Sequence, residues 1–177
     1  MKYGETTCFA KVSLDDPVLT GEESYRVIGP DISFVRNIRS QYSEIMRKMK
    51  GLNRHYSCLE KALVVKAHIP YGYLTIGSLM VWNHDRSGSY GHYYNPPLEF
   101  HAWVMVEQMD KILVVDFGLP GVIEKGLITA DHIGPVLSDI EPVILCGRPF
   151  QWTDYTARSF LDEDECKRQA EIFSLDI

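Results

Sequence analysis

Basic clusters, paired cysteines and long apolar runs are all scarce in this sequence. Its 18 Lys and Arg residues are outnumbered by 24 Asp and Glu residues, which gives a formal net charge of −6. No run of basic residues is long enough to follow a phosphate backbone. No stretch approaches the roughly 20 apolar residues that a membrane-spanning helix requires. We therefore expect partners other than nucleic acid or a membrane.

The four cysteines, Cys8, Cys58, Cys146 and Cys166, are widely separated and form no C-x-x-C pair. This spacing argues against a zinc ribbon and against a thioredoxin-type redox motif. The histidine spacings also match no metal-site pattern, so no metal or cofactor is expected. The first residues contain no apolar segment of signal-peptide length. The sequence therefore predicts a cytoplasmic protein with reduced thiols, or one that is delivered without a cleaved signal peptide.

The length and the ordinary proportion of apolar residues predict one domain, residues 1–177, with its core at about 31–120. Apolar residues three and four apart predict an amphipathic helix over 31–49. Runs rich in β-branched and aromatic residues predict strands at 8–14, 73–82, 100–106, 112–117 and 143–146. A polar loop is expected at 83–97 and a final helix at 157–173. Helices followed by several strands predict an α+β fold with an antiparallel sheet.

The clearest helix start is the segment Ser57-Cys58-Leu59-Glu60, which fits the capping box S-x-x-E. Pro70 is expected to end this helix. Cys58 then occupies the first helical position, where free N–H groups and the helix dipole favour a negative charge. Because a thiol is a poor nucleophile until it loses its proton, this position predicts Cys58 as the nucleophile. The other three cysteines lack such a setting and are interpreted as structural.

A base and an orienting carboxylate for Cys58 are predicted on two neighbouring strands. His101 begins one apolar run and Asp116 ends the next. If the turn between them is centred between residues 108 and 109, positions 101 and 116 lie opposite each other. A charged Asp inside an apolar strand needs a partner to offset its desolvation, and His101 supplies one. Cys58, His101 and Asp116 are therefore the predicted catalytic triad.

Together these motifs resemble the transglutaminase-like superfamily of cysteine enzymes, which has a papain-like Cys-His-Asp triad. The matching parts are a Cys at a helix start, His-Ala-Trp-Val on a strand and Val-Asp-Phe on the next strand. The spacings of 43 residues from Cys58 to His101 and of 15 from there to Asp116 are typical of compact bacterial members and of the related arylamine N-acetyltransferases. The resemblance covers about residues 50–120. It implies a nucleophile at the N-terminus of a buried helix that packs on an antiparallel sheet.

Three further residues are weaker candidates for an oxyanion hole or a substrate site. Asn53 and Tyr56 lie just upstream of Cys58 and are candidate side-chain donors, as upstream polar residues are in related folds, with a plain loop role as the alternative. Trp103 either packs in the core or touches substrate, and packing is the favoured interpretation. The loop at 83–97, rich in His and Tyr, is a candidate lid or substrate wall.

Three functions follow from these expectations. The first is a thiol hydrolase that acts on an amide bond, in a peptide, a glutamine side chain or a small amide, through an acyl-enzyme on Cys58. The second is a transglutaminase or another acyltransferase that uses an amine or a thioester. The third is a catalytically silent module that keeps the fold for protein binding. Hydrolysis is favoured because water is always present and no amine-binding site is evident.

Overall fold

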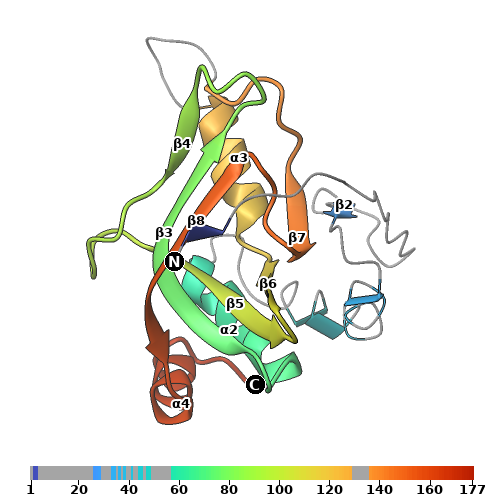
Figure 1. The fold of residues 1–177 in the computed structure, drawn as a ribbon. Coiled ribbons are helices and arrows are strands. Elements are labelled where there is room, and N and C mark those ends of the chain that lie inside the picture. Colours follow the sequence, from blue (N-terminus) through green and yellow to red (C-terminus); the bar gives the residue numbers. More distant parts are fainter. Residues whose placement is uncertain are drawn as a thin grey trace.

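The computed structural model describes residues 2–3, 26–28, 57–128 and 136–177, together with the helical residues 33, 34, 36, 38, 41, 44, 45, 47 and 48. Helices pack on a sheet that is antiparallel except for one pair of strands, so the predicted α+β class is confirmed (Figure 1). None of the described helices combines the length and the apolar character needed to cross a membrane.

The described strands form one sheet in the order β1-β8-β3-β5-β6-β7-β2, and β4 pairs with β3 beside this path. The exception to antiparallel pairing is the parallel pair of β2 with β7. The strands are β1 (Lys2–Tyr3), β2 (Arg26–Ile28), β3 (Tyr73–Trp82), β4 (Ser89–His92), β5 (His101–Gln108), β6 (Lys111–Asp116), β7 (Val143–Gly147) and β8 (Thr153–Leu161). The helices are α2 (Cys58–His68), α3 (Leu119–Ile128) and α4 (Glu163–Ile172).

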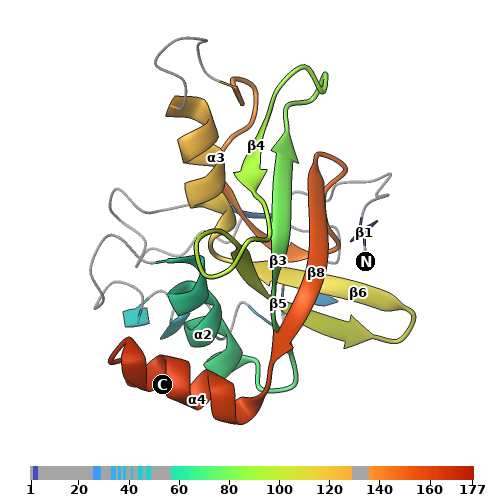
Figure 2. The same ribbon diagram turned by 90° about the vertical axis from the view of Figure 1, so that its left-hand side faces the viewer.

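Strand β5 lies at the centre of the fold and is covered on both faces. Figure 2 shows β3 and β8 running side by side, with the hairpin of β5 and β6 crossing them at a wide angle. On one face of β5, Val104 and Val106 pack with Val64 and Val65 of α2. On the other face, Trp103 belongs to the cluster that includes α3 and β8. Burial on both faces explains why residues 101–106 are all buried.

The described part of the predicted helix at 31–49 agrees with its apolar stripe. All of the described residues between 33 and 48 are helical. Ile38 and Ile45 are buried, whereas Arg36 and Arg47 are exposed. The ends of this helix and the strand predicted at 8–14 lie outside the described residues. The strand predicted at 73–82 is confirmed as β3, and the one at 143–146 as β7.

Three segments differ from their predictions. The loop at 83–97 contains β4, whose residues pair with β3 through the backbone although they are polar. A glycine makes this pairing possible, since a Cβ at Gly91 would lie 2.0 Å from the Leu79 carbonyl oxygen.

Residues 153–161 form strand β8, and the last helix begins only at Glu163, because Asp162 caps it by accepting from the Glu165 N–H. Helix α3 was not predicted.

The hairpin of β5 and β6 is offset from the predicted register. Val104 pairs with Val115 and Gln108 with Lys111, so Trp103 stands opposite Asp116 and His101 does not. The turn holds only two residues, and the first of them, Met109, has a positive φ of 54°. Because the offset from the predicted partner is two residues, side chains keep their faces, and His101 remains a diagonal neighbour of Asp116.

Candidate active site

Cys58 is the first residue of α2, and the local sequence explains why the helix starts there. The Glu60 N–H donates to Ser57 Oγ at 3.3 Å, and the Ser57 N–H donates to Glu60 Oε2 at 2.8 Å, so the predicted capping box is present. The Cys58 thiol is half-buried and its Sγ lies 3.6 Å from the Phe100 carbonyl oxygen. The first N–H groups of a helix have no acceptor within it, so the start of α2 is a setting that favours an anion beside the sulfur.

His101 and Asp116 form a buried pair across the hairpin. His101 Nε2 lies 2.7 Å from Asp116 Oδ2, and both side chains are shielded from solvent. Burial disfavours the imidazolium, but the charge of Asp116 and the hydrogen bond to it outweigh burial, with a smaller contribution from Cys58. Together they raise the pKa of His101 to about 10. At neutral pH this arrangement favours a charged His101 beside an ionised Asp116.

The second ring nitrogen of His101, Nδ1, is buried and has no hydrogen-bond partner of normal geometry among the described residues. Cys58 lies close to this pair, and the space around Gly118 shows it. A Cβ added to Gly118 would lie 3.1 Å from His101 Cε1, 3.4 Å from Cys58 Cβ and 3.1 Å from Asp116 Oδ1. The three predicted residues therefore gather around one glycine, and Nδ1 is the His101 nitrogen left for Cys58. Their arrangement has the order of a nucleophile, a base and an orienting carboxylate.

Asp116 is held by four hydrogen bonds. Its Oδ2 accepts from His101 and from the Tyr155 hydroxyl at 2.7 Å, and its Oδ1 accepts from the N–H groups of Gly118 at 2.7 Å and Leu119 at 3.0 Å. Burial alone would raise the pKa of Asp116, but the charge of His101 and these hydrogen bonds lower it overall. The carboxylate thus fixes the His101 ring and also caps the start of α3.

Tyr155 is the functional candidate that the sequence did not predict. It stands on β8, fully buried, and burial together with the charge of Asp116 raises its pKa well above the ordinary value. Its hydroxyl therefore stays protonated and donates to Asp116. Trp103 is also fully buried; its ring stacks on His101 at 6.0 Å and meets Tyr155 edge-on at 5.1 Å. Trp103 exposes no surface for a substrate, and its contacts support the packing role.

A second histidine stands beside His101. His92, on β4, stacks its ring on that of His101 with 6.2 Å between centroids, and 24 % of its side chain is exposed. Burial and the charge of His101 lower the pKa of His92. Strand β4 therefore brings part of the predicted polar loop against the candidate site. The sequence indicated a wall of the site here but did not indicate which residue forms it.

The other predicted site residues either lie outside the described part of the chain or are buried. Asn53 and Tyr56 lie outside the described residues, as does Cys8. Cys146 and Cys166 are buried, in keeping with structural roles. Within the described residues, no three His, Cys, Asp or Glu side chains are grouped in a way that would hold a metal ion. Compared with known proteins, no family model, curated protein or solved structure matches this chain.

Proposed function

We propose that this chain is a thiol-dependent hydrolase that cleaves an amide bond, in a peptide or a glutamine side chain, through an acyl-enzyme on Cys58. One observation carries the proposal: the buried 2.7 Å hydrogen bond between His101 Nε2 and Asp116 Oδ2, beside a thiol at a helix start. Burying a charged pair costs desolvation free energy unless good geometry and further hydrogen bonds compensate for it. Its location next to Cys58 matches the requirement of a nucleophile for an oriented base.

In the proposed reaction, the Cys58 thiolate attacks the amide carbon, and the carbonyl electrons move to oxygen. The N–H at the start of α2 stabilises this oxyanion. The His101 imidazolium then gives its proton to the departing amine as the C–N bond breaks, which leaves a thioester on Cys58. Neutral His101 next removes a proton from a water molecule that attacks the thioester. The acid is released, and the thiolate and the imidazolium are restored.

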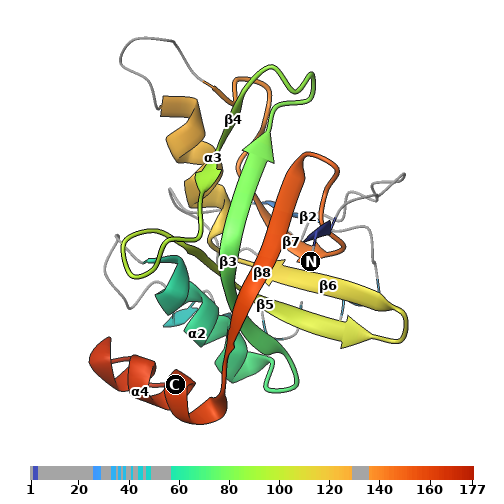
Figure 3. The ribbon, with the colours of Figure 1, turned by 60° about the vertical axis from the view of Figure 1, so that its left-hand side comes forward.

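We also propose that the chain belongs to the transglutaminase-like superfamily, which its sequence resembles, and that its triad has the papain-like arrangement. Two features support it. The candidate nucleophile begins a helix that packs on antiparallel strands, and the candidate base and carboxylate stand on the adjacent strands β5 and β6 (Figure 3). Peptides, proteins and small amides are the proposed substrates, and the cytoplasm remains the expected location.

A screen of donors tests the function. Peptides, glutamine-containing peptides, an activated ester and an acyl thioester are each incubated with the protein, with and without an excess of a primary amine. We expect hydrolysis products without amine, and no products from Cys58→Ser. Products formed only with amine would assign the chain to transferases instead. If the activated ester leaves no acyl group on Cys58 in a mass spectrum, the covalent mechanism is wrong and a silent binding module replaces it.

A further inference from the structure

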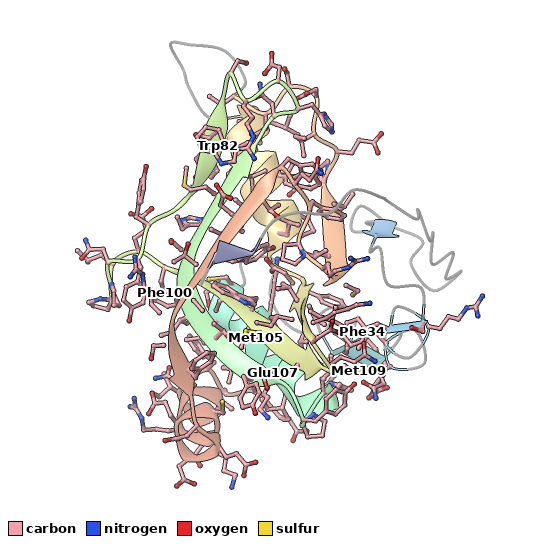
Figure 4. The ribbon with its side chains drawn as sticks, viewed as in Figure 1. Phe34, Trp82, Phe100, Met105, Glu107 and Met109 are labelled. Atoms are coloured by element: carbon pink, nitrogen blue, oxygen red, sulfur yellow. The ribbon has the colours of Figure 1, made fainter. Side chains whose placement is uncertain are left out.

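A groove of about 740 Å³ lies at the end of the molecule away from the candidate triad. The last turn of α2, the turn at 70–72 and the adjacent ends of β3, β5, β8 and α4 enclose it. Figure 4 labels Phe100 just before β5 and Glu107 near its far end, where the groove lies. At about 3.3 Å per residue, Met105 in the groove is roughly 13 Å along the strand from His101. The groove is therefore separate from the triad.

Exposed aromatic rings line this groove. Tyr71 is 60 % exposed, Phe160 53 % and Tyr73 48 %, although rings of this size are usually covered. Tyr73 and Phe160 meet edge to face with 6.0 Å between their centroids. Strand β3 supplies one ring and β8 the other, so the sheet itself fixes their spacing. Large apolar groups that remain exposed together indicate a surface that a partner covers.

The charge in the groove is predominantly negative. Glu107, Asp162 and Glu163 line it, and none of them forms a salt bridge with another described residue. Lys66 is the basic residue of the lining, but its Nζ donates to the Pro70 carbonyl oxygen. Asp162 uses one carboxylate oxygen to cap α4. The groove therefore combines aromatic faces with acidic groups, a combination that attracts cations.

We infer that the groove binds a peptide segment that carries lysine or arginine side chains. A cationic head against the exposed surfaces of Tyr73 and Phe160 gains cation–π attraction, and Glu107, Asp162 and Glu163 supply its counter-charge. The methylene stems of Lys or Arg cover the exposed rings. The volume falls within the range of ligand sites and exceeds the needs of a single side chain. This site goes beyond the proposed function, because binding there requires neither Cys58 nor His101.

Fluorescence anisotropy of labelled peptides tests the inference on the full chain carrying Cys58→Ser, which cannot turn a peptide over. One peptide alternates Gly with Lys and Arg, and its control carries Gln at the basic positions. We expect the basic peptide to bind and the neutral one to bind at least about tenfold more weakly, with affinity that falls as salt rises. Equal binding of the two peptides would overturn the inference.

Matched variants locate the binding. Glu107→Gln keeps the shape of the side chain and Tyr73→Ala removes a ring, and each should weaken binding about three- to tenfold. The controls are Asp110→Asn in the hairpin turn and Tyr93→Ala, an exposed ring outside the groove, which should leave affinity unchanged. Melting temperatures show whether each variant folds. If Glu107→Gln binds as the parent does, or if the control variants lose as much affinity, the groove is not the site. Because binding is measured without turnover, its failure would leave the proposed hydrolase untouched.

Discussion

The two ends of β5 differ in how their polar groups are placed: one end buries them and the other exposes them. At its first residue, His101 and Asp116 are buried, and Asp116 has four hydrogen-bond donors. Near its last residues, Glu107 and the ring of Tyr73 face an open groove, and the acid has no ionic partner among the described residues. One strand thus joins a buried, hydrogen-bonded pair of charges to an exposed surface.

The difference indicates separate tasks for the two ends. Chemistry needs fixed geometry, which a buried hydrogen-bonded network provides at the cost of desolvation. Reversible binding instead needs groups that remain accessible and whose charges become paired only when the partner arrives. Substitutions at the buried end should therefore change rates and thiol reactivity, and those at the open end should change peptide affinity alone.

The largest effect is expected from Cys58→Ser. Serine is close in size to cysteine, so the fold and the peptide affinity of the groove should persist. Turnover should fall at least about 10³-fold, because a hydroxyl is far harder to ionise. The measurements are initial rates on a substrate from the donor screen and the melting temperature. Near-normal turnover in this variant would rule out covalent catalysis by Cys58.

Asp116→Asn should lower turnover by about 10²–10⁴, by comparison with the serine triad. The amide keeps the shape of the carboxylate but removes the charge that stabilises the imidazolium and fixes its tautomer. Rates, melting temperature and the pH dependence of Cys58 alkylation are measured together. As a control, Asp110→Asn makes the same chemical change in the exposed turn of this hairpin. A folded Asp116→Asn protein with an unchanged rate and unchanged alkylation would show that Asp116 serves structure alone.

Tyr155→Phe should lower turnover by about tenfold, the effect of one lost hydrogen bond to a charged group. Since the Tyr155 hydroxyl lowers the pKa of Asp116, its removal raises that pKa. The acidic limb of the rate profile should then move to higher pH, a shift that a purely structural role would not produce. Tyr93→Phe, in the exposed loop after β4, is the matched control. A pH profile identical to that of the parent would exclude a positioning role for Tyr155.

The smallest effect concerns stability against pH. The folded state raises the pKa of His101 from 6.5 to about 10. Its contribution to stability is therefore complete below pH 6.5 and is lost as the pH rises towards 10. The melting temperature should fall over this interval by at least about 2–4 °C, the shift expected for a loss of about 1 kcal/mol in a chain of this length. His101→Gln should flatten the dependence, whereas His84→Gln at the exposed pair with Asp139 should retain it.

Local signals account for the part of the site that the sequence predicted. The capping box Ser57 to Glu60 depends only on adjacent residues, so it fixed both the helix start and the place of Cys58. The hairpin was predicted from two β-rich runs separated by residues 107–111, but its register was wrong because Met109 and Asp110 form the turn, one residue beyond the predicted centre. Met109, which has a positive φ, is not a residue type that marks such a turn. The even offset left His101 and Asp116 on one face.

Long-range contacts account for what the sequence did not predict. Helix α3 contains Gly121 and Gly126, which lower helix propensity, and its start is capped by a carboxylate from β6. Tyr155 meets Asp116 across 39 residues of sequence, and nothing beside it marks that contact. Residues 157–161 of its strand were predicted as part of the last helix, whereas Asp162 caps that helix and places its start at Glu163.

The most direct test of the account is brief labelling with iodoacetamide at pH 6 to 7, followed by mass spectrometry of all four cysteines. We expect Cys58 to be modified first and Asp116→Asn to slow this modification, whereas Asp110→Asn should not. The buried Cys146, whose pKa burial raises, should stay unmodified. Preferential labelling of Cys8, Cys146 or Cys166 would contradict the central claim that Cys58 is an activated thiol.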